Sequence, residues 1–421
     1  MFFQAGSASV VITPGKATDL GGYAGRTGKS LGTHDDLYAK ALVWEQKGNF
    51  YALITADLAG LSQKAAGRIK KKIRQQLGIP ERHLVLACSH THSGPTLDVF
   101  AGMGTPDSCY ALFLEKRIVS CVQQALKSLA PACLVAGKGK VRININRCWP
   151  EGPVDEEISV LLVRSAEKPI ARLVNYACHP VVLGRDNLFF SADYPGVVQT
   201  MTEKVLGGIT LFTLGCCGDI NPQLRGSFQI AEKLGQVLAG EVIRVESLLP
   251  QGTQPEIKMR KEKIFLPLHP PSQKQLKKIL VESQRQENKS TCLLEKVTWK
   301  RWADWACFYL SLSEKKDLPR KIPVTLTAIS TGETTLLFLP GEVFVEIGLK
   351  IKKESPFPHT VIVSCADGVV GYFPTGKVFC KHGYETDAAF IWYQNLPFSP
   401  RVEDTVIRGS LRLLKKVACE K

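Results

Sequence analysis

A polar block that follows a short apolar run constrains this chain more than any other feature. Residues 84–86 are Leu-Val-Leu, and residues 87–95 read Ala-Cys-Ser-His-Thr-His-Ser-Gly-Pro. The apolar run is typical of a buried strand, and Gly-Pro marks a turn. His90 and His92 therefore lie where a strand enters a loop, and side chains two apart on an extended segment project to the same side. Imidazole binds zinc and shuttles protons, but a His-x-His pair is also often a hydrogen-bonded structural pair.

The pattern along the chain predicts a layered α/β fold. Strand-like stretches alternate with amphipathic, helix-like ones, which is typical of helices that cover a sheet. We expect strands at 8–12, 39–44, 51–57, 84–86, 132–144, 158–163, 171–177, 210–214, 324–329, 335–339 and 360–365, and helices at 62–77, 110–129, 195–205, 227–246, 343–353 and 402–417. Consecutive strands between 132 and 177 indicate a mixed sheet rather than a purely parallel one.

Residues 251–323 differ from the rest in composition. This segment holds a Pro-rich stretch at 266–271, basic helix-like stretches, and Trp299, Trp302 and Trp305 at threefold spacing. We predict a basic insertion or subdomain within a catalytic domain made of residues 1–250 and 324–421. The tryptophans could face a membrane or a substrate, but such a stripe more often packs a helix on its own domain, and we expect the latter.

The composition narrows the class of protein. With 421 residues, 44% of them hydrophobic and 22% charged, the chain is ordinary globular material. The chain contains no run of 18 apolar residues, so no membrane-spanning helix is predicted. The N-terminus lacks the features of a signal peptide. The thirteen cysteines are odd in number and include no Cys-x-x-Cys pair. They favour buried free thiols in a reducing compartment, so we predict a cytoplasmic protein.

The chain carries a formal net charge of +15, with much of the excess in residues 258–321. Such a charge permits attraction to anionic lipid, nucleic acid or acidic substrates. Peripheral contact with an anionic membrane is one expectation from this pattern. A solvated basic face is the commoner outcome, and we do not expect nucleic acid to be the partner.

Polar residues also end two other apolar strands. Residues 173–178 run into His179, and residues 336–339 run into Pro340-Gly341-Glu342. A glutamate at a helix start can be merely a favourable first-turn charge. Two histidines and one glutamate are nonetheless a known ligand set for catalytic zinc, with a position left for a reactive water. Gly218 and Asp219 either line the same cleft or form a tight turn.

Seven motifs appear in an order that resembles one known family. In chain order they are Cys88-Ser-His-Thr-His-Ser-Gly-Pro95, Asn146-Arg147, Asn175-Tyr-Ala-Cys-His-Pro180, Ser191-Ala-Asp-Tyr-Pro-Gly196, Gly218-Asp-Ile-Asn-Pro222, Pro340-Gly-Glu342 and Gly371-Tyr372. The series resembles the catalytic domain of the neutral, non-lysosomal ceramidases over residues 6–388. The His-Thr-His-Ser-Gly-Pro block is its most specific part.

The resemblance implies a zinc-dependent hydrolase that cleaves the amide bond of ceramide. It implies zinc ligands at His90, His179, Glu342 and Tyr372, a proton-handling histidine at His92, and oxyanion donors at Arg147 and Tyr384. We also expect Asp193 either to orient the His179 ring by contacting it on the side away from the metal, or to be a turn residue. Asp219 and Asn221 are expected in the substrate pocket.

Three departures from the family leave the substrate open. Asn221 stands where ceramidases carry a serine, and we expect neither their following β-sandwich domain nor their secretory signal. No implied metal ligand is lost, so the metal chemistry should remain. An acyl amide, small or lipid-like, is the expected substrate. A zinc esterase or phosphoesterase on the same scaffold, and a non-catalytic protein that binds anionic lipid or nucleic acid, are the alternatives.

Overall fold

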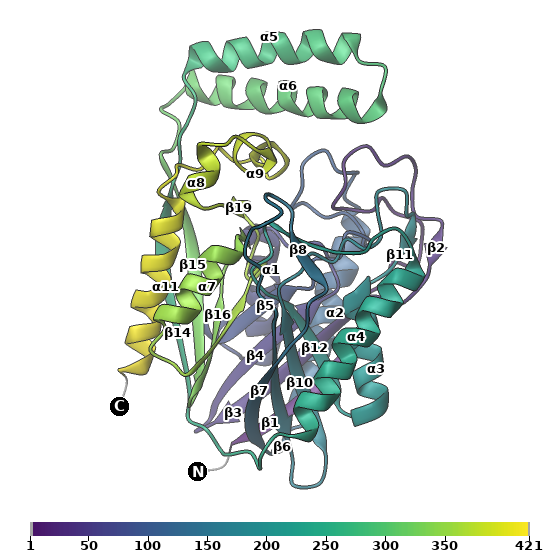
Figure 1. Cartoon of the computed structure of the whole chain (residues 1–421), viewed down its shortest axis with the longest axis vertical. Coiled ribbons are helices and arrows are strands. Elements are labelled where there is room, and N and C mark those ends of the chain that lie inside the picture. Colours follow the sequence, from purple (N-terminus) through teal and green to yellow (C-terminus); the bar gives the residue numbers. More distant parts are fainter. Residues whose placement is uncertain (1–2, 420–421) are drawn as a thin grey trace.

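Three mixed β-sheets with helices on their outer faces form the centre of the molecule (Figure 1), in a computed structural model that describes residues 3–419. The first sheet has the strand order β5-β4-β3-β1-β6. Its strands are β1 (Gln4–Val11), β3 (Tyr38–Gln46), β4 (Asn49–Ala56), β5 (Leu84–Cys88) and β6 (Ala130–Pro131). Helices α1 (Gln63–Leu77) and α2 (Ser108–Lys127) pack on it and share one apolar core with it. A short 3₁₀ turn, η1 (Glu81–His83), precedes β5.

The second sheet has the order β12-β10-β9-β7, and α3 and α4 cover it. Its elements are β7 (Cys133–Lys140), β9 (Glu157–Arg164), β10 (Pro169–Tyr176), β12 (Ile209–Leu214), α3 (Tyr194–Leu206) and α4 (Phe228–Ser247). Two short ladders lie beside it. They join β8 (Asn144–Asn146) to β13 (Ile220–Pro222), and β2 (Gly32–Thr33) to β11 (Phe189–Phe190).

The third sheet has the order β14-β15-β16-β18, and α7 and α11 lie against it. Its elements are β14 (Ile257–Pro267), β15 (Lys321–Thr331), β16 (Thr334–Phe338), β18 (His359–Val363), α7 (Val345–Glu354) and α11 (Val402–Ala418). A parallel ladder joins β17 (Glu342–Val343) to β19 (Tyr372–Phe373). The short helices α8 (Gly376–Phe379), α9 (Tyr384–Asp387) and α10 (Ala389–Trp392) follow β19. The expected layered α/β class is confirmed, with three mixed sheets in place of one.

Local sequence explains where the helices begin and end. The Ser62 side chain accepts a hydrogen bond from the backbone N–H of Ala65 and caps the start of α1. Gly78 ends the helix in the left-handed region, at φ 75°, with its N–H bonded to the Arg74 carbonyl. Ile69 and Ile73, four residues apart, form part of its buried face.

The three sheets meet through their edge strands β5, β12 and β18. The backbone N–H of Cys88, at the end of β5, donates to the Cys365 carbonyl at 3.2 Å, and the N–H of Ser364 donates to the Leu214 carbonyl at 2.8 Å. Each of these edge strands is parallel to its neighbour in the sheet. The carboxyl ends of strands from all three sheets therefore converge, and the loops that follow them share one site.

The segment 251–323 adds both a strand and a helical hairpin. Its first part is β14, which pairs with β15 along its whole length, and the helix-like stretches of the segment are the two helices that follow. Ile264 and Leu266, two residues apart on β14, both face the core. This is the alternation expected of a strand with one buried face. Helices α5 (Gln273–Lys289) and α6 (Leu293–Ser313) form the hairpin that lies beyond α8 and α9 in Figure 1.

Two of the three tryptophans dock α6 on its own domain, as expected. Trp305 is buried, and its indole N–H donates to the Asn395 carbonyl at 2.8 Å. Trp302 packs edge-to-face against Trp305 and Phe390, with ring centroids 5.6 and 5.5 Å apart. Trp299 lies farther along the helix and is only partly buried. The hairpin is therefore held by one end of the tryptophan stripe.

We expect Trp305→Ala to lower the free energy of unfolding by about 3–5 kcal/mol, because it removes a fully buried ring and one hydrogen bond. Urea denaturation measures the change. Trp299→Ala is the matched control on the same helix and should cost much less. Equal losses in both variants would show that this contact does not dock the hairpin.

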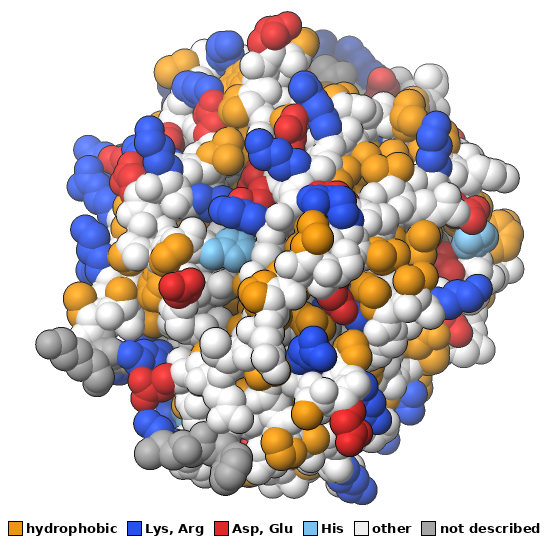
Figure 2. Space-filling model, turned by 60° about the horizontal axis from the view of Figure 1, so that its bottom comes forward, with side chains coloured by type: hydrophobic (Ala, Val, Ile, Leu, Met, Phe, Trp, Pro, Cys, Tyr) orange, Lys and Arg blue, Asp and Glu red, His pale blue; other side chains and the backbone are white. Residues whose placement is uncertain are grey.

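The surface and the cysteines complete the fold. None of the helices within residues 3–419 is both long and apolar enough to cross a bilayer. All thirteen cysteines are free thiols. On the face shown in Figure 2, the Lys and Arg side chains are spread among acidic and hydrophobic ones rather than gathered in a single patch.

Candidate active site

His90 lies in the loop after β5, in a conformation that few residues other than glycine adopt. Its φ is 70°, and its backbone N–H donates to the Leu58 carbonyl at 2.9 Å. Its ring is fully buried, with Nδ1 hydrogen-bonded to the Ala59 carbonyl and 3.6 Å from the Cys365 sulfur. The surrounding loops thus fix both the strained backbone and the ring, which is typical of functional sites.

His179 and Glu342 follow strands of the other two sheets, β10 and β16, and meet His90. His179 follows β10, and its Nδ1 lies 3.1 Å from the Ile220 carbonyl. Its Nε2 is 2.9 Å from Glu342 Oε2, and the His90 Nε2 is 3.3 Å from the same oxygen. All three side chains are almost fully buried. Sequence reasoning named these three residues, and the structure brings them together.

The hydrogen bonds of the two imidazoles show that this cluster suits a cation. A carbonyl acceptor at each Nδ1 requires the proton there, so Nε2 of a neutral His90 or His179 carries a lone pair. Both lone pairs face Glu342 Oε2, which is itself an acceptor. Zinc ligands in tetrahedral geometry, about 2.0–2.1 Å from the metal, are a little over about 3 Å apart. The donor set and its spacing therefore fit Zn²⁺.

The ionisation of the cluster agrees with a need for positive charge. Burial alone would raise the pKa of Glu342, but His90 and His179 hold it well below its usual range. Burial lowers the pKa of His179 to about 4, against the opposing effect of Glu342. For His90, the effects of Cys365 and Glu342 overcome burial and raise the pKa. A cation bound among the three groups would supply the positive charge that stabilises the ionised Glu342 carboxylate.

His92 borders the cluster and faces a cavity. Its Nε2 lies 3.3 Å from His90 Nε2, and its Nδ1 is buried without a hydrogen-bond partner. Donor atoms of His90, His92 and His179 lie within 4.8 Å of one another, so three histidines are a second ligand set. Only His92 of the three lines the cavity.

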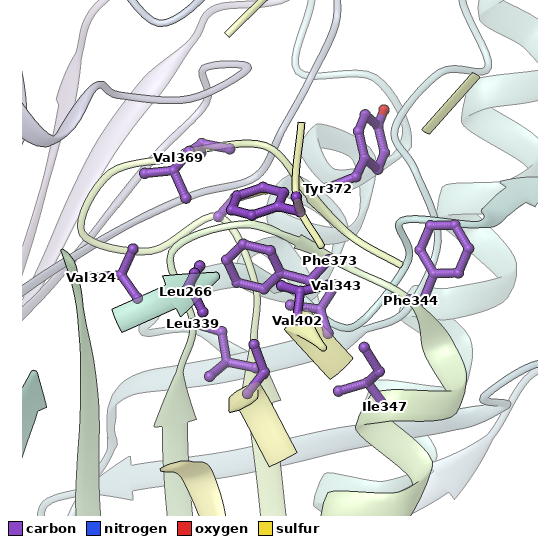
Figure 3. Close-up of a cluster of buried hydrophobic side chains, with 14 of the residues drawn as sticks. Leu266, Val324, Leu339, Val343, Phe344, Ile347, Val369, Tyr372, Phe373 and Val402 are labelled. Carbon is purple, nitrogen blue, oxygen red and sulfur yellow. The ribbon is translucent and has the colours of Figure 1, made fainter. Parts of the chain in front are cut away.

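Tyr372 lies beside Glu342 because the β17–β19 ladder pairs the two residues. Neighbouring side chains on a strand point to opposite faces. Phe373 therefore enters the apolar cluster beneath, with Val343 and Phe344, while the Tyr372 hydroxyl points away from it (Figure 3). Burial raises the pKa of Tyr372, which keeps the phenol protonated.

Arg147 and Tyr384 line the cavity next to Tyr372. The Arg147 guanidinium lies 5.5 Å from the Tyr372 ring centroid and forms an ion pair with Glu385 at 2.8 Å. Tyr384 is 45% exposed, and its ring centroid is 6.0 Å from that of Tyr372. Both line the same cavity as His92, Glu342 and Tyr372.

The cavity has a volume of about 370 Å³ and an apolar end. Phe100, Met103, Ile391 and Trp392 line that end. Leu294 and Thr298 of α6 also line the cavity, so the inserted hairpin forms part of its wall. An apolar space beside convergent polar groups is typical of a small-molecule or lipid-chain site.

Tyr393 is a site residue that sequence reasoning missed. Its hydroxyl donates to Glu342 Oε1, the carboxylate oxygen that faces away from His179. It follows α10 and not a strand-end motif, so no pattern in the sequence marks it as a site residue. Three α6 side chains hold the surrounding backbone: Arg301 donates to the Ile391 carbonyl, Trp305 to that of Asn395, and Tyr309 to that of Gln394.

The other expected site residues lie away from the cavity lining. Asp219 is buried, accepts hydrogen bonds from Asn146 and from the N–H of Val345, and supports the Arg147 backbone through its carbonyl. Asn221 sits in β13 with its side-chain oxygen unpartnered. Asp193 accepts from the backbone N–H groups of Leu183 and Tyr194, and the contact at His179 Nδ1 comes from Ile220 instead.

The fold and the site define an α/β protein with a buried His-His-Glu cluster, suited to a metal, at the edge of a cavity. The sequence model of the neutral/alkaline non-lysosomal ceramidases, N-terminal region, matches residues 3–237. The chain belongs to this family.

A named relative and two solved structures agree with that assignment. The neutral ceramidase of Pseudomonas aeruginosa PAO1 is 25% identical over an alignment 255 residues long, which covers 53% of this chain but only 37% of that protein. The crystal structure of neutral ceramidase from Pseudomonas aeruginosa covers all of this chain and 76% of its own, with 17% identity and a TM-score of 0.74. A ceramidase complexed with C2 matches with the same coverage and identity and a TM-score of 0.76. These structural matches show the shared fold.

Proposed function

We propose that this protein is a zinc-dependent hydrolase of acyl amides related to ceramide. The observation that carries the proposal is the cluster of His90, His179 and Glu342, in which three acceptor atoms face one another beside an apolar cavity. A zinc ion held there would acidify a bound water and polarise the acyl carbonyl. The family membership of the chain supports the amide bond as the target.

The chain's own residues have distinct tasks in this reaction. One water is consumed: its hydroxyl joins the acyl carbon, the carbon–nitrogen bond breaks, and the proton goes to the leaving nitrogen. His92 faces the cavity and carries that proton. Arg147 and Tyr384 donate hydrogen bonds to the carbonyl oxygen as its negative charge grows. Tyr393 holds the Glu342 carboxylate in place.

The substrate is expected to bring an acyl chain. Phe100, Met103 and Trp392 line the apolar end of the cavity, and Leu294 of the hairpin also lines the cavity. A site of this kind would also cleave an ester. Because Asn221 replaces the family serine, the preference for an amide or an ester bond has to be measured. We further propose a reducing compartment such as the cytoplasm, supported by the thirteen free thiols, and a peripheral approach to lipid surfaces.

The test is a substrate panel with metal control. The protein loaded with Zn²⁺ is expected to release fatty acid from an acyl amide faster than from the matching ester or any phosphate ester. A chelator should abolish the activity and added Zn²⁺ should restore it. Turnover of phosphate esters alone would replace the proposal with a phosphoesterase. Absence of bound zinc, together with insensitivity to chelators, would refute the enzyme.

A further inference from the structure

Three arginines lie near Tyr23: Arg185, which lines the cavity and is exposed, and Arg26 and Arg225, which lie outside the cavity lining. Tyr23 and Arg185 line the cavity together with His92. The Arg26 guanidinium lies 5.0 Å from the Tyr23 ring centroid, and Arg225 Nη2 donates to the Tyr23 hydroxyl at 3.1 Å. We call Arg26, Arg185 and Arg225 the arginine cluster. It lies outside the set of residues that the family resemblance implies.

No carboxylate neutralises the arginine cluster. Arg26 donates to the carbonyls of Gly21, Gly184 and Arg185, and Arg225 donates to the carbonyl of Val181. Within residues 3–419, none of the three arginines forms an ion pair, and the Arg185 guanidinium has no hydrogen-bond partner. Arg147, which also lines the cavity, is by contrast paired with Glu385.

The nearby acids do not supply the missing charge. Asp186 is exposed and forms no ion pair within the described residues, although it lies close enough to affect Arg26. Asp193 is buried and accepts two backbone N–H groups. The Glu342 carboxylate is shared among His90, His179 and Tyr393. The wall around Tyr23 therefore keeps excess positive charge.

The cluster lies on the side of the cavity where the amine leaves. The Tyr23 ring meets the His92 ring edge-on, with centroids 5.0 Å apart. Gly22, at φ 88°, packs so closely on the His92 ring that a Cβ there would come within 2.5 Å of it. Because His92 delivers the proton to the leaving nitrogen, the group attached to that nitrogen must lie near Tyr23 and Arg185.

We propose that the arginine cluster binds an anionic group, such as a carboxylate, that the substrate carries close to its amide nitrogen. The substrate class is then an N-acyl amide with an acidic amine portion, such as an N-acyl amino acid, rather than a neutral ceramide. Arg185 contacts the anion, while Arg26 fixes the loop by binding the Gly184 and Arg185 carbonyls. This inference rests on the proposed function, since it uses the role of His92.

The physical reason for the preference is charge. A carboxylate that meets an unpaired guanidinium forms a charge-assisted, often bidentate hydrogen-bond pair. A neutral hydroxyl in the same place forms a weaker bond and leaves the cluster without a counter-ion. The energy is gained when the substrate binds and does not change as the amide breaks, so it should lower KM and leave kcat unchanged.

The test compares two substrates that differ in one group. N-dodecanoylglycine ends its amine portion in a carboxylate, and N-dodecanoylethanolamine ends it in a hydroxyl. We expect the wild-type protein to show a KM for the glycine compound at least about tenfold lower. Arg185→Gln should raise that KM by about 10- to 100-fold, leave kcat unchanged, and have little effect on the ethanolamine compound.

Arg185→Lys and Arg82→Gln are the matched variants. Lysine keeps the charge but loses the two-pronged geometry, so it should restore part of the affinity. Arg82 is exposed in η1, at the opposite end of β5 from His90, and its change should alter neither KM. Equal KM values for both compounds in the wild-type protein, or no effect of Arg185→Gln on the glycine compound, would overturn the inference while amide hydrolysis stands.

Two further measurements separate this inference from the proposed function. If no amide is cleaved, the proposed function fails and the proposed substrate class falls with it; calorimetric binding of N-dodecanoylglycine then decides only whether the cluster binds the anion, which it does if Arg185→Gln weakens that binding. Phosphatidylglycerol added to neutral micelles is the second measurement. Stimulation of ethanolamide hydrolysis that needs Arg185 would assign the cluster to a lipid headgroup and overturn the proposed substrate class.

Discussion

His90→Ala is expected to remove the metal, whereas His92→Ala is expected to keep the metal and lose turnover. His90 Nε2 and His179 Nε2 both face Glu342 Oε2, so loss of His90 breaks the ligand set. His92 lines the cavity, where a proton must be delivered to the leaving nitrogen. Loss of a general acid or base typically costs about 100- to 10,000-fold in rate, and we expect kcat of His92→Ala to fall within that range.

The experiment discriminates because the geometry offers two ligand sets. His92 Nε2 is 3.3 Å from His90 Nε2, and the three histidines alone could hold an ion. In that arrangement Glu342 would act as a base, and both variants would lose metal equally. In the arrangement with Glu342 as a ligand, His92 lines the cavity outside the ligand set and remains available for proton transfer.

Zinc content by elemental analysis and kcat by fatty-acid release measure the two effects. His83→Ala is the matched control, because His83 lies in η1 at the opposite end of β5 from His90. It should change neither quantity. Equal loss of zinc from His90→Ala and His92→Ala would show that His92 is a ligand.

The residues at the ends of apolar strands could be predicted from sequence. His90, His179 and Glu342 each follow a buried strand by a few positions, and a polar group there has no role in the core. Such residues can be recognised because a polar, ionisable side chain directly follows an apolar strand. The fold class followed from the same alternation of strand-like and helix-like stretches.

The way the strands come together could not be predicted. Three sheets join through β5, β12 and β18, and part of this contact runs between backbone groups, as from Ser364 to Leu214. Backbone groups are the same in every residue, so no side-chain pattern records this contact. The role of the Ile220 carbonyl at His179 was missed for the same reason, and Asp193 was considered because its side chain is visible in the sequence.

Tyr393 shows a second limit of sequence reasoning. Its link to Glu342 depends on the backbone of residues 391–395, which Arg301, Trp305 and Tyr309 hold from about 90 residues earlier in the chain. In the sequence the insertion is separate from the other predicted site residues. In the structure α6 both lines the cavity and supports a contact of Glu342.

Arg147→Gln is the second variant with a large expected effect. We expect kcat to fall by about 100- to 1,000-fold with zinc content unchanged, the typical loss when one donor to a developing oxyanion is removed. The guanidinium is paired with Glu385, and its interactions with Tyr372 and Glu385 outweigh burial and raise its pKa, so it stays charged. The charge faces the cavity that Tyr384 and His92 also line.

Two variants test whether Arg147 acts on the substrate or only supports the fold. Arg142→Gln removes an exposed arginine that pairs with Glu156 at 3.5 Å, and it should leave kcat unchanged. Glu385→Gln keeps Arg147 charged but removes the ion pair that positions the Arg147 guanidinium. The fall in kcat caused by Glu385→Gln should therefore be much smaller than that caused by Arg147→Gln. A transition-state analogue with an anionic oxygen should bind Arg147→Gln far more weakly, while a substrate-like amide should bind it almost normally. Equal weakening of both, or loss of zinc, would mean that Arg147 serves the structure around Tyr372 rather than the reaction.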